Sequence, residues 1–106
     1  MKTLTTIFIA ALALSAPAKA TNDEICVNIK ILGNSITSLK QSGLSKESTK
    51  LVVVSGKTPS RETIEILDAV INFVYSRPGV TTEAEKRAQR INNSTMLYEI
   101  CKKGIK

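Results

Sequence analysis

The sequence predicts an all-α domain, a small bundle of about four helices in which one disulfide joins the first and last helices. Three observations support this fold class. Apolar residues recur at steps of three and four along successive segments. Each segment is bounded by capping or helix-breaking residues. The two cysteines lie near opposite ends of the domain. A cleaved leader is expected to precede it.

Residues 1–20 have the three parts of a secretory signal peptide. Lys2 makes the first part positive, residues 7–14 form an apolar stretch, and Ala18-Lys19-Ala20 places small residues where a signal peptidase reads them. We expect cleavage before Thr21.

A membrane anchor is the alternative interpretation of this leader. A spanning helix needs about 20 apolar residues, and here Ser15 and Pro17 interrupt the run early. We therefore expect export to the periplasm or secretion, with no stable membrane insertion after cleavage. Residues 21–106 would form one domain, because such a short chain supports a single core.

The composition is moderately basic. The chain has 15 basic and 9 acidic residues and a net charge of +6, of which the leader would remove Lys2 and Lys19. The basic residues are scattered and aromatics are few, whereas nucleic-acid sites combine a basic face with stacking aromatics. We expect no nucleic-acid partner.

Cys26 and Cys101 are the only cysteines. In an oxidising compartment, an isolated pair in a small domain indicates a structural disulfide. A redox pair usually has Cys-x-x-Cys spacing, and a zinc site needs four ligands, whereas this chain has no third cysteine and no histidine. The bond would contribute about 4–5 kcal/mol by the chain-entropy model.

The first helix is predicted over residues 22–42. Thr21 and Glu24 fit a capping box, and Gly43 is a plausible stop. The apolar stripe consists of Ile25, Ile29, Leu32, Ile36 and Leu39.

A short second helix is predicted over residues 46–54, with Ser45 as its N-cap. Residues 51–54 are rich in β-branched side chains, which favour a strand by propensity. A lone strand would have no partner, so a helix is favoured, although the sequence leaves both conformations open.

The third helix is predicted from Thr58-Pro59, with Thr58 as cap and Pro59 at the first helical position. It should end near Ser76, before Pro78. Its apolar stripe is Ile64, Leu67, Val70, Ile71, Val74 and Tyr75.

The fourth helix should begin at a capping box formed by Thr82 and Glu85. We expect its apolar stripe to run beside Leu97 and Cys101. The stripe comprises Ala84, Ala88, Ile91, Thr95 and Tyr98. To bring Cys101 to Cys26, the first and last helices must lie antiparallel.

The residues for common catalytic chemistry are largely missing. Without histidine, Ser–His and Cys–His nucleophiles are excluded. Glu62, Glu65 and Asp68 could serve a small carboxylate-dependent enzyme, but their spacing is typical of a solvated helix face. We expect no enzymatic activity, no metal and no cofactor.

Three features could contact a protein partner, and one of them is the amphipathic side chain of Tyr98. Val52, Val53 and Val54 are apolar on every side of a short helix. Tyr75 and Arg77 are residue types enriched at binding hot spots, and they lie at a rigid corner. Core packing or ordinary loop surface is the alternative for each.

Four short motifs carry a resemblance. They are Cys26, Gly43-Leu44-Ser45, Val74-Tyr75-x-x-Pro78 and Cys101. With these the chain resembles a loose group of small exported proteobacterial proteins, which implies export, helices and the disulfide. In overall design it is also similar to periplasmic immunity proteins and periplasmic acid-stress chaperones.

The leading functional hypothesis is a periplasmic, non-enzymatic protein-binding module, such as an inhibitor or immunity-like protein. A stress-responsive holdase and a carboxylate-dependent enzyme are the alternatives. The sequence does not identify the partner.

Overall fold

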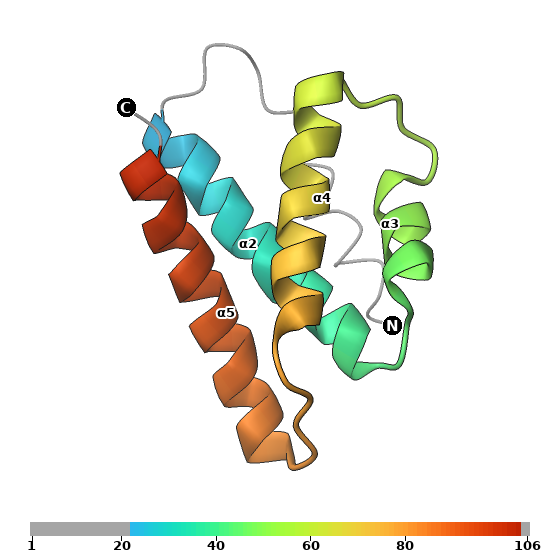
Figure 1. The fold of residues 1–106 in the computed structure, drawn as a ribbon, viewed down its shortest axis with the longest axis vertical. Helices are drawn as coiled ribbons and strands as arrows, with labels where there is room; N and C mark the ends of the chain where they lie inside the picture. The colour runs from blue at the N-terminus through green and yellow to red at the C-terminus, as the bar shows by residue number, and fades with distance from the viewer. Residues whose placement is uncertain (1–21, 105–106) are drawn as a thin grey trace.

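The computed structural model describes residues 22–104, so the predicted leader and the Thr21 cap lie outside the described residues. This part of the chain is all-helical, as predicted, and contains no strand. Its helices are α2 (Asn22–Gln41), α3 (Lys46–Val54), α4 (Arg61–Ser76) and α5 (Glu83–Gly104). In Figure 1, α2 runs diagonally through the centre and passes behind α4, while α5 lies on the left and packs against α2.

The predicted disulfide is confirmed. It joins Cys26 at the start of α2 to Cys101 near the end of α5, with the two Cα atoms 5.5 Å apart. The two helices are antiparallel, so the start of α2 and the end of α5 lie at one end of the bundle, where the disulfide joins them (Figure 1).

The turn between α2 and α3 follows the predicted capping residues. Gly43 adopts a left-handed conformation with φ of 99°, and the Leu44 N–H donates to the Leu39 carbonyl over 3.2 Å, as in a Schellman motif. The Ser45 side chain then accepts from the Ser48 N–H. Because α3 continues to Val54, residues 51–54 are helical rather than extended.

The predicted start of the third helix was wrong by two residues. The N-cap is Ser60, whose hydroxyl accepts from the Thr63 N–H over 3.1 Å. Thr58 and Pro59 therefore precede the helix. The physical reason is that Ser60 supplies the capping oxygen itself, so the helix does not need the Thr58 cap.

The core lies where α2, α3, α4 and α5 meet. Its buried aliphatic residues are Leu32, Ile36, Leu39, Val53, Leu67, Val70, Ile71, Val74 and Leu97. The stripes predicted for α2 and α4 supply most of this core. α5 contributes only Leu97 to this cluster.

The stripe predicted for α5 was wrong. Ala84, Ala88, Ile91 and Thr95 are exposed, whereas the buried residues of α5 are Asn93, Ser94, Leu97 and Cys101. The disulfide explains this rotation: Cys101 must face α2, and side chains three or four residues apart share that face. The apolar residues on the other side are turned to solvent.

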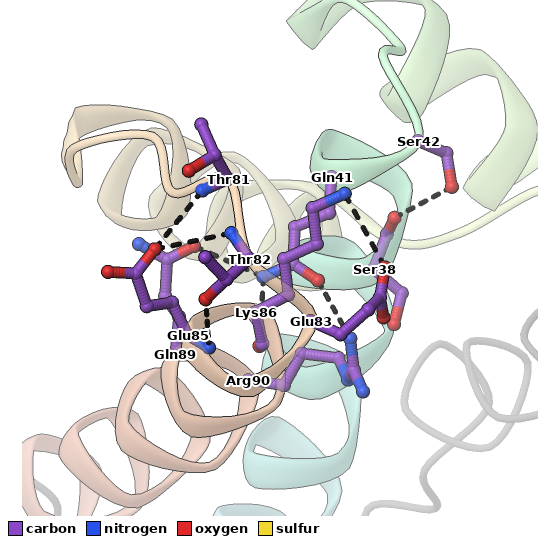
Figure 2. Close-up of polar contacts among 10 residues, drawn as sticks. All are labelled: Ser38, Gln41, Ser42, Thr81, Thr82, Glu83, Glu85, Lys86, Gln89 and Arg90. Carbon is purple, nitrogen blue, oxygen red and sulfur yellow. Dashed lines mark hydrogen bonds and ion pairs between the residues drawn. The ribbon is translucent and has the colours of Figure 1, made fainter.

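The contact between α2 and α5 is made by small and polar residues. A Cβ added at Gly33 would collide with Leu97 Cδ1, so glycine allows the helices to approach closely. One turn further on, the Asn93 amide donates to Thr37 Oγ1 over 3.1 Å, and Thr37 donates to the Gly33 carbonyl over 2.7 Å. Figure 2 shows how this polar contact continues toward the end of α2.

Candidate functional site

An apolar groove of about 450 Å³ lies between α4 and α5, near the disulfide end of the bundle. Both helices pack on α2 rather than closely on each other, and the space between them forms the groove. Its lining consists of Ile29, Ile66, Ala69, Val70, Phe73, Leu97, Ile100, Cys101 and Gly104. A surface of this kind suits a hydrophobic ligand or side chain.

The walls of the groove are accessible from solvent. Ile66 on α4 is 39% exposed, and Ile100 on α5 is 54% exposed. Val70 and Leu97 are buried and belong to the core. The groove is therefore a shallow opening over a packed floor, with aliphatic side chains available on both sides.

Covalent and polar contacts hold the helix ends beside the groove. Cys101, which lines it, is bonded to the fully buried Cys26. On the surface, Asp23 accepts hydrogen bonds from Lys102 and Tyr98, each over 2.9 Å. These bonds lower the pKa of the Asp23 carboxyl below its ordinary value. The first turns of α2 and the last turns of α5 are thus joined by one disulfide and two surface hydrogen bonds.

The opposite end of the α2–α5 pair is joined by polar side chains. Figure 2 shows Gln41, Gln89 and Arg90 meeting between the helices. The Gln41 amide donates to the Lys86 carbonyl over 3.0 Å, and Arg90 donates to Gln41 Oε1 over 2.9 Å. The predicted Thr82–Glu85 capping box is also present, with both of its hydrogen bonds made (Figure 2). These contacts fix α5 at its start.

Arg77 is the C-cap of α4 and follows the groove residue Phe73 by four positions. Its guanidinium carbon is 5.6 Å from the centroid of Phe73, which lines the groove. Lys40 approaches from α2 and donates to the carbonyls of Arg77 and Val74, over 2.5 and 3.3 Å. Partial burial, together with repulsion from Arg77, lowers the pKa of Lys40. Two cationic side chains therefore lie near one end of the groove.

The valine run is mostly internal. Val53 is 1% exposed, and Val52 and Val54 are half-buried against the core. The most exposed aliphatic residue of α3 is instead Leu51, at 68%. Contact of Val52 and Val54 with a partner stays a prediction, while Val53 presents no surface for one.

Tyr75 uses its hydroxyl inside the fold. The oxygen lies 2.6 Å from Thr49 Oγ1 and donates to the Leu44 carbonyl over 2.7 Å. It therefore connects α4 to α3 and to the preceding turn. The structure separates the predicted pair, because Arg77 faces the groove end and Tyr75 faces α3.

The three carboxylates considered for catalysis do not form a cluster. Glu62 and Glu65 are exposed. Asp68 pairs with Lys50 over 2.9 Å in a small hollow between α3 and α4. Within residues 22–104, no group of three or more histidine, cysteine or acidic side chains could hold a metal ion.

Comparisons with known proteins found no matching family model, no similar curated protein and no similar solved structure. Among the described helices, none has the length and apolar character needed to cross a membrane.

The groove residues Ile66, Phe73 and Ile100 were not predicted from the sequence. A signal was present, because Ile66, Ala69 and Phe73 repeat at helical spacing beside the predicted α4 stripe. This second face was overlooked because one apolar stripe is enough for a helix that packs on a single neighbour.

Proposed function

We propose that this protein is a non-enzymatic binding module of the periplasm or extracellular space, and that its groove receives an apolar helical segment of a partner protein. The observation that carries this proposal is the solvent-accessible apolar lining, with Ile66 and Ile100 exposed on facing walls. Inhibition of an enzyme or neutralisation of a toxin would be forms of this activity.

The groove has features suited to helix docking. Amphipathic helices bind by placing their apolar face in a groove of a second protein. A preformed groove limits the entropy lost on binding, and the disulfide and the Asp23 contacts hold this end of the bundle. The buried floor would let one or two anchor side chains be fully desolvated, as at binding hot spots.

The expected compartment is consistent with the disulfide, because such bonds persist mainly in oxidising environments. Cleavage of residues 1–20 remains part of the proposal. A small domain is sufficient for this function, because binding one helix of a partner requires only one surface.

Quantitative capture from an envelope extract tests the proposal. Ile100→Asp places a charge in the groove, and Leu51→Asp makes the same change at an exposed aliphatic residue of α3. We expect the partner to be retained by the native protein and by L51D and to be lost with I100D. Circular dichroism and thermal unfolding would show that both variants fold.

Two results would overturn the proposal. Capture of the same proteins by native protein and I100D would show that the groove is not the docking site. Groove-dependent suppression of aggregation of many unrelated unfolded proteins, without one stable partner, would support the holdase instead.

A further inference from the structure

The charges at one end of the groove indicate what kind of helix it receives. Arg77 lies one turn beyond Phe73, and its guanidinium stacks on a ring that lines the groove. A helix lying along the groove toward the end of α4 would bring a side chain close to this cation.

Arg77 has no carboxylate partner among residues 22–104. The ion pairs in this part of the chain join Lys50 to Asp68, Lys86 to Glu83 and Lys102 to Asp23. Arg77 Nε is buried without a hydrogen-bond partner, so a docked segment would not reach this atom. The two terminal nitrogens of an arginine can also form a bidentate pair with a carboxylate, and these are the atoms through which Arg77 would bind one.

Lys40 strengthens the local positive charge but is otherwise engaged. Its ammonium group donates to the carbonyls of Val74 and Arg77, where it satisfies the end of α4. Its interaction with Arg77 is repulsive. The carbonyl of Arg77 is therefore held in place, while its half-buried guanidinium forms none of the ion pairs named above.

We infer that the partner segment is an amphipathic helix with an acidic residue about one turn beyond its apolar anchors, positioned to pair with Arg77. This inference rests on the proposed function, and it adds a charge requirement to the apolar one. The apolar face would supply most of the affinity, and the carboxylate would set the direction in which the helix lies.

A displayed library of amphipathic helical peptides, randomised on one face and at both ends, tests the charge requirement. Selection would use the oxidised native domain, with counter-selection on I100D to retain only groove-dependent peptides. We expect the selected sequences to share Asp or Glu at one end. Replacing this residue by Gln or Asn should weaken binding by about threefold to tenfold at low salt.

Arg77→Gln is the decisive variant, and Lys46→Gln on α3 is its matched control, since each removes one positive charge. With R77Q the selected peptides should bind equally well with the acid or the amide, whereas K46Q should keep the preference. Arg77→Lys should keep part of it, because the charge remains but the bidentate geometry is lost.

The outcomes separate this inference from the proposed function. Groove-dependent peptides without an acidic preference, or a preference that survives R77Q, would overturn the inference and leave the docking function intact. Failure to recover any groove-dependent peptide would overturn both. Binding of decanoate in the groove, with no peptide binding, would show that the site takes small amphiphiles.

Discussion

Gly33 has the strictest steric requirement of the described glycines. A Cβ there would collide with Leu97 Cδ1, the end of a buried side chain, whereas Ser94 Cα at 3.7 Å would be in ordinary contact. Overpacking costs about 1–3 kcal/mol, and replacing glycine by alanine in a helix returns about 1 kcal/mol. We therefore predict that Gly33→Ala lowers the free energy of unfolding by a net amount of up to about 2 kcal/mol. Urea unfolding would measure it.

Gly79→Ala provides the control, because a Cβ at Gly79 meets nothing within 4 Å. Leu97→Ala should relieve part of the strain, so G33A and L97A should be non-additive in a double-mutant cycle. Equal stability of G33A and the native protein would show that the Leu97 side chain moves aside without cost.

Tyr75 illustrates how one residue is given different roles by sequence and structure. Its type and position indicated a binding hot spot, but its hydroxyl contacts Thr49 and the Leu44 carbonyl inside the fold. Thr49 is fully buried, and nothing in the sequence indicates that its hydroxyl pairs with that of Tyr75. Such pairs depend on tertiary packing, which periodicity alone does not specify.

We predict that Tyr75→Phe destabilises the protein by about 1–3 kcal/mol, because it leaves buried polar groups without their partner. Thermal and urea unfolding at neutral pH would measure the loss. Tyr98→Phe removes a hydroxyl that bonds the exposed Asp23, and we expect it to change stability much less. If Y75F and Y98F lost the same free energy of unfolding, the buried contact of Tyr75 would contribute no more to stability than the surface contact of Tyr98.

At the level of helices, patterns of apolar residues predicted the existence and buried faces of α2 and α4 well. For α3, the sequence predicted the bounds from the Ser45 cap and the absence of a strand partner, and it assigned no buried face. They failed for α5, whose buried face includes Asn93 and Ser94 while Ile91 is exposed. The failure has a physical cause. The disulfide, the close approach at Gly33 and the polar contact with Thr37 together set which face of α5 meets α2. Apolar periodicity does not detect small or polar interfaces.

The groove was harder to predict than the helices that form it. Its walls come from α4 and α5, which are separated in sequence and diverge in space. Ile66 and Ile100 could each be identified as extra apolar positions, but their juxtaposition follows only from how both helices pack on α2. Arg77 was identified by residue type, and its relation to Phe73 required the fold.

The contact of Asp23 with Lys102 links the first turn of α2 to the last turns of α5. It lowers the carboxyl pKa below its ordinary value of 3.8 in the folded protein. A depressed folded-state pKa contributes stability above the unfolded-state value, and this is lost as pH falls through the folded-state value. We therefore predict that the contribution is present at neutral pH and disappears below about pH 4.

Asp23→Asn tests this pH dependence. Relative to the native protein, D23N should be less stable at neutral pH, and the difference should vanish in acid when both are compared by urea unfolding. Glu47→Gln, on the exposed start of α3, serves as the control carboxylate. A constant difference between native protein and D23N at every pH would assign the effect to something other than ionisation.

For the whole molecule, the disulfide has the largest single effect that we expect. It closes a loop with a sequence separation of 75 residues, for which the chain-entropy model gives about 4–5 kcal/mol. A domain of this kind has a net stability of about 5–15 kcal/mol. Reduction should therefore leave the domain marginal, and urea unfolding with and without dithiothreitol would measure the difference.

The loss should also be uneven along the chain. Gln41 and Arg90 still hold the far end of the α2–α5 pair after reduction, whereas Cys26 and Cys101 lie at the groove end. Hydrogen exchange of the reduced protein should therefore rise first in the early turns of α2 and the late turns of α5. Because Cys101 lines the groove, separation of the two helix ends after reduction should weaken peptide binding. The contacts of Tyr75 with α3 lie away from the disulfide and should be kept. Uniform exchange, or a reduced protein as stable as the oxidised one, would show that packing at Gly33 and Leu97 is sufficient to hold this end closed.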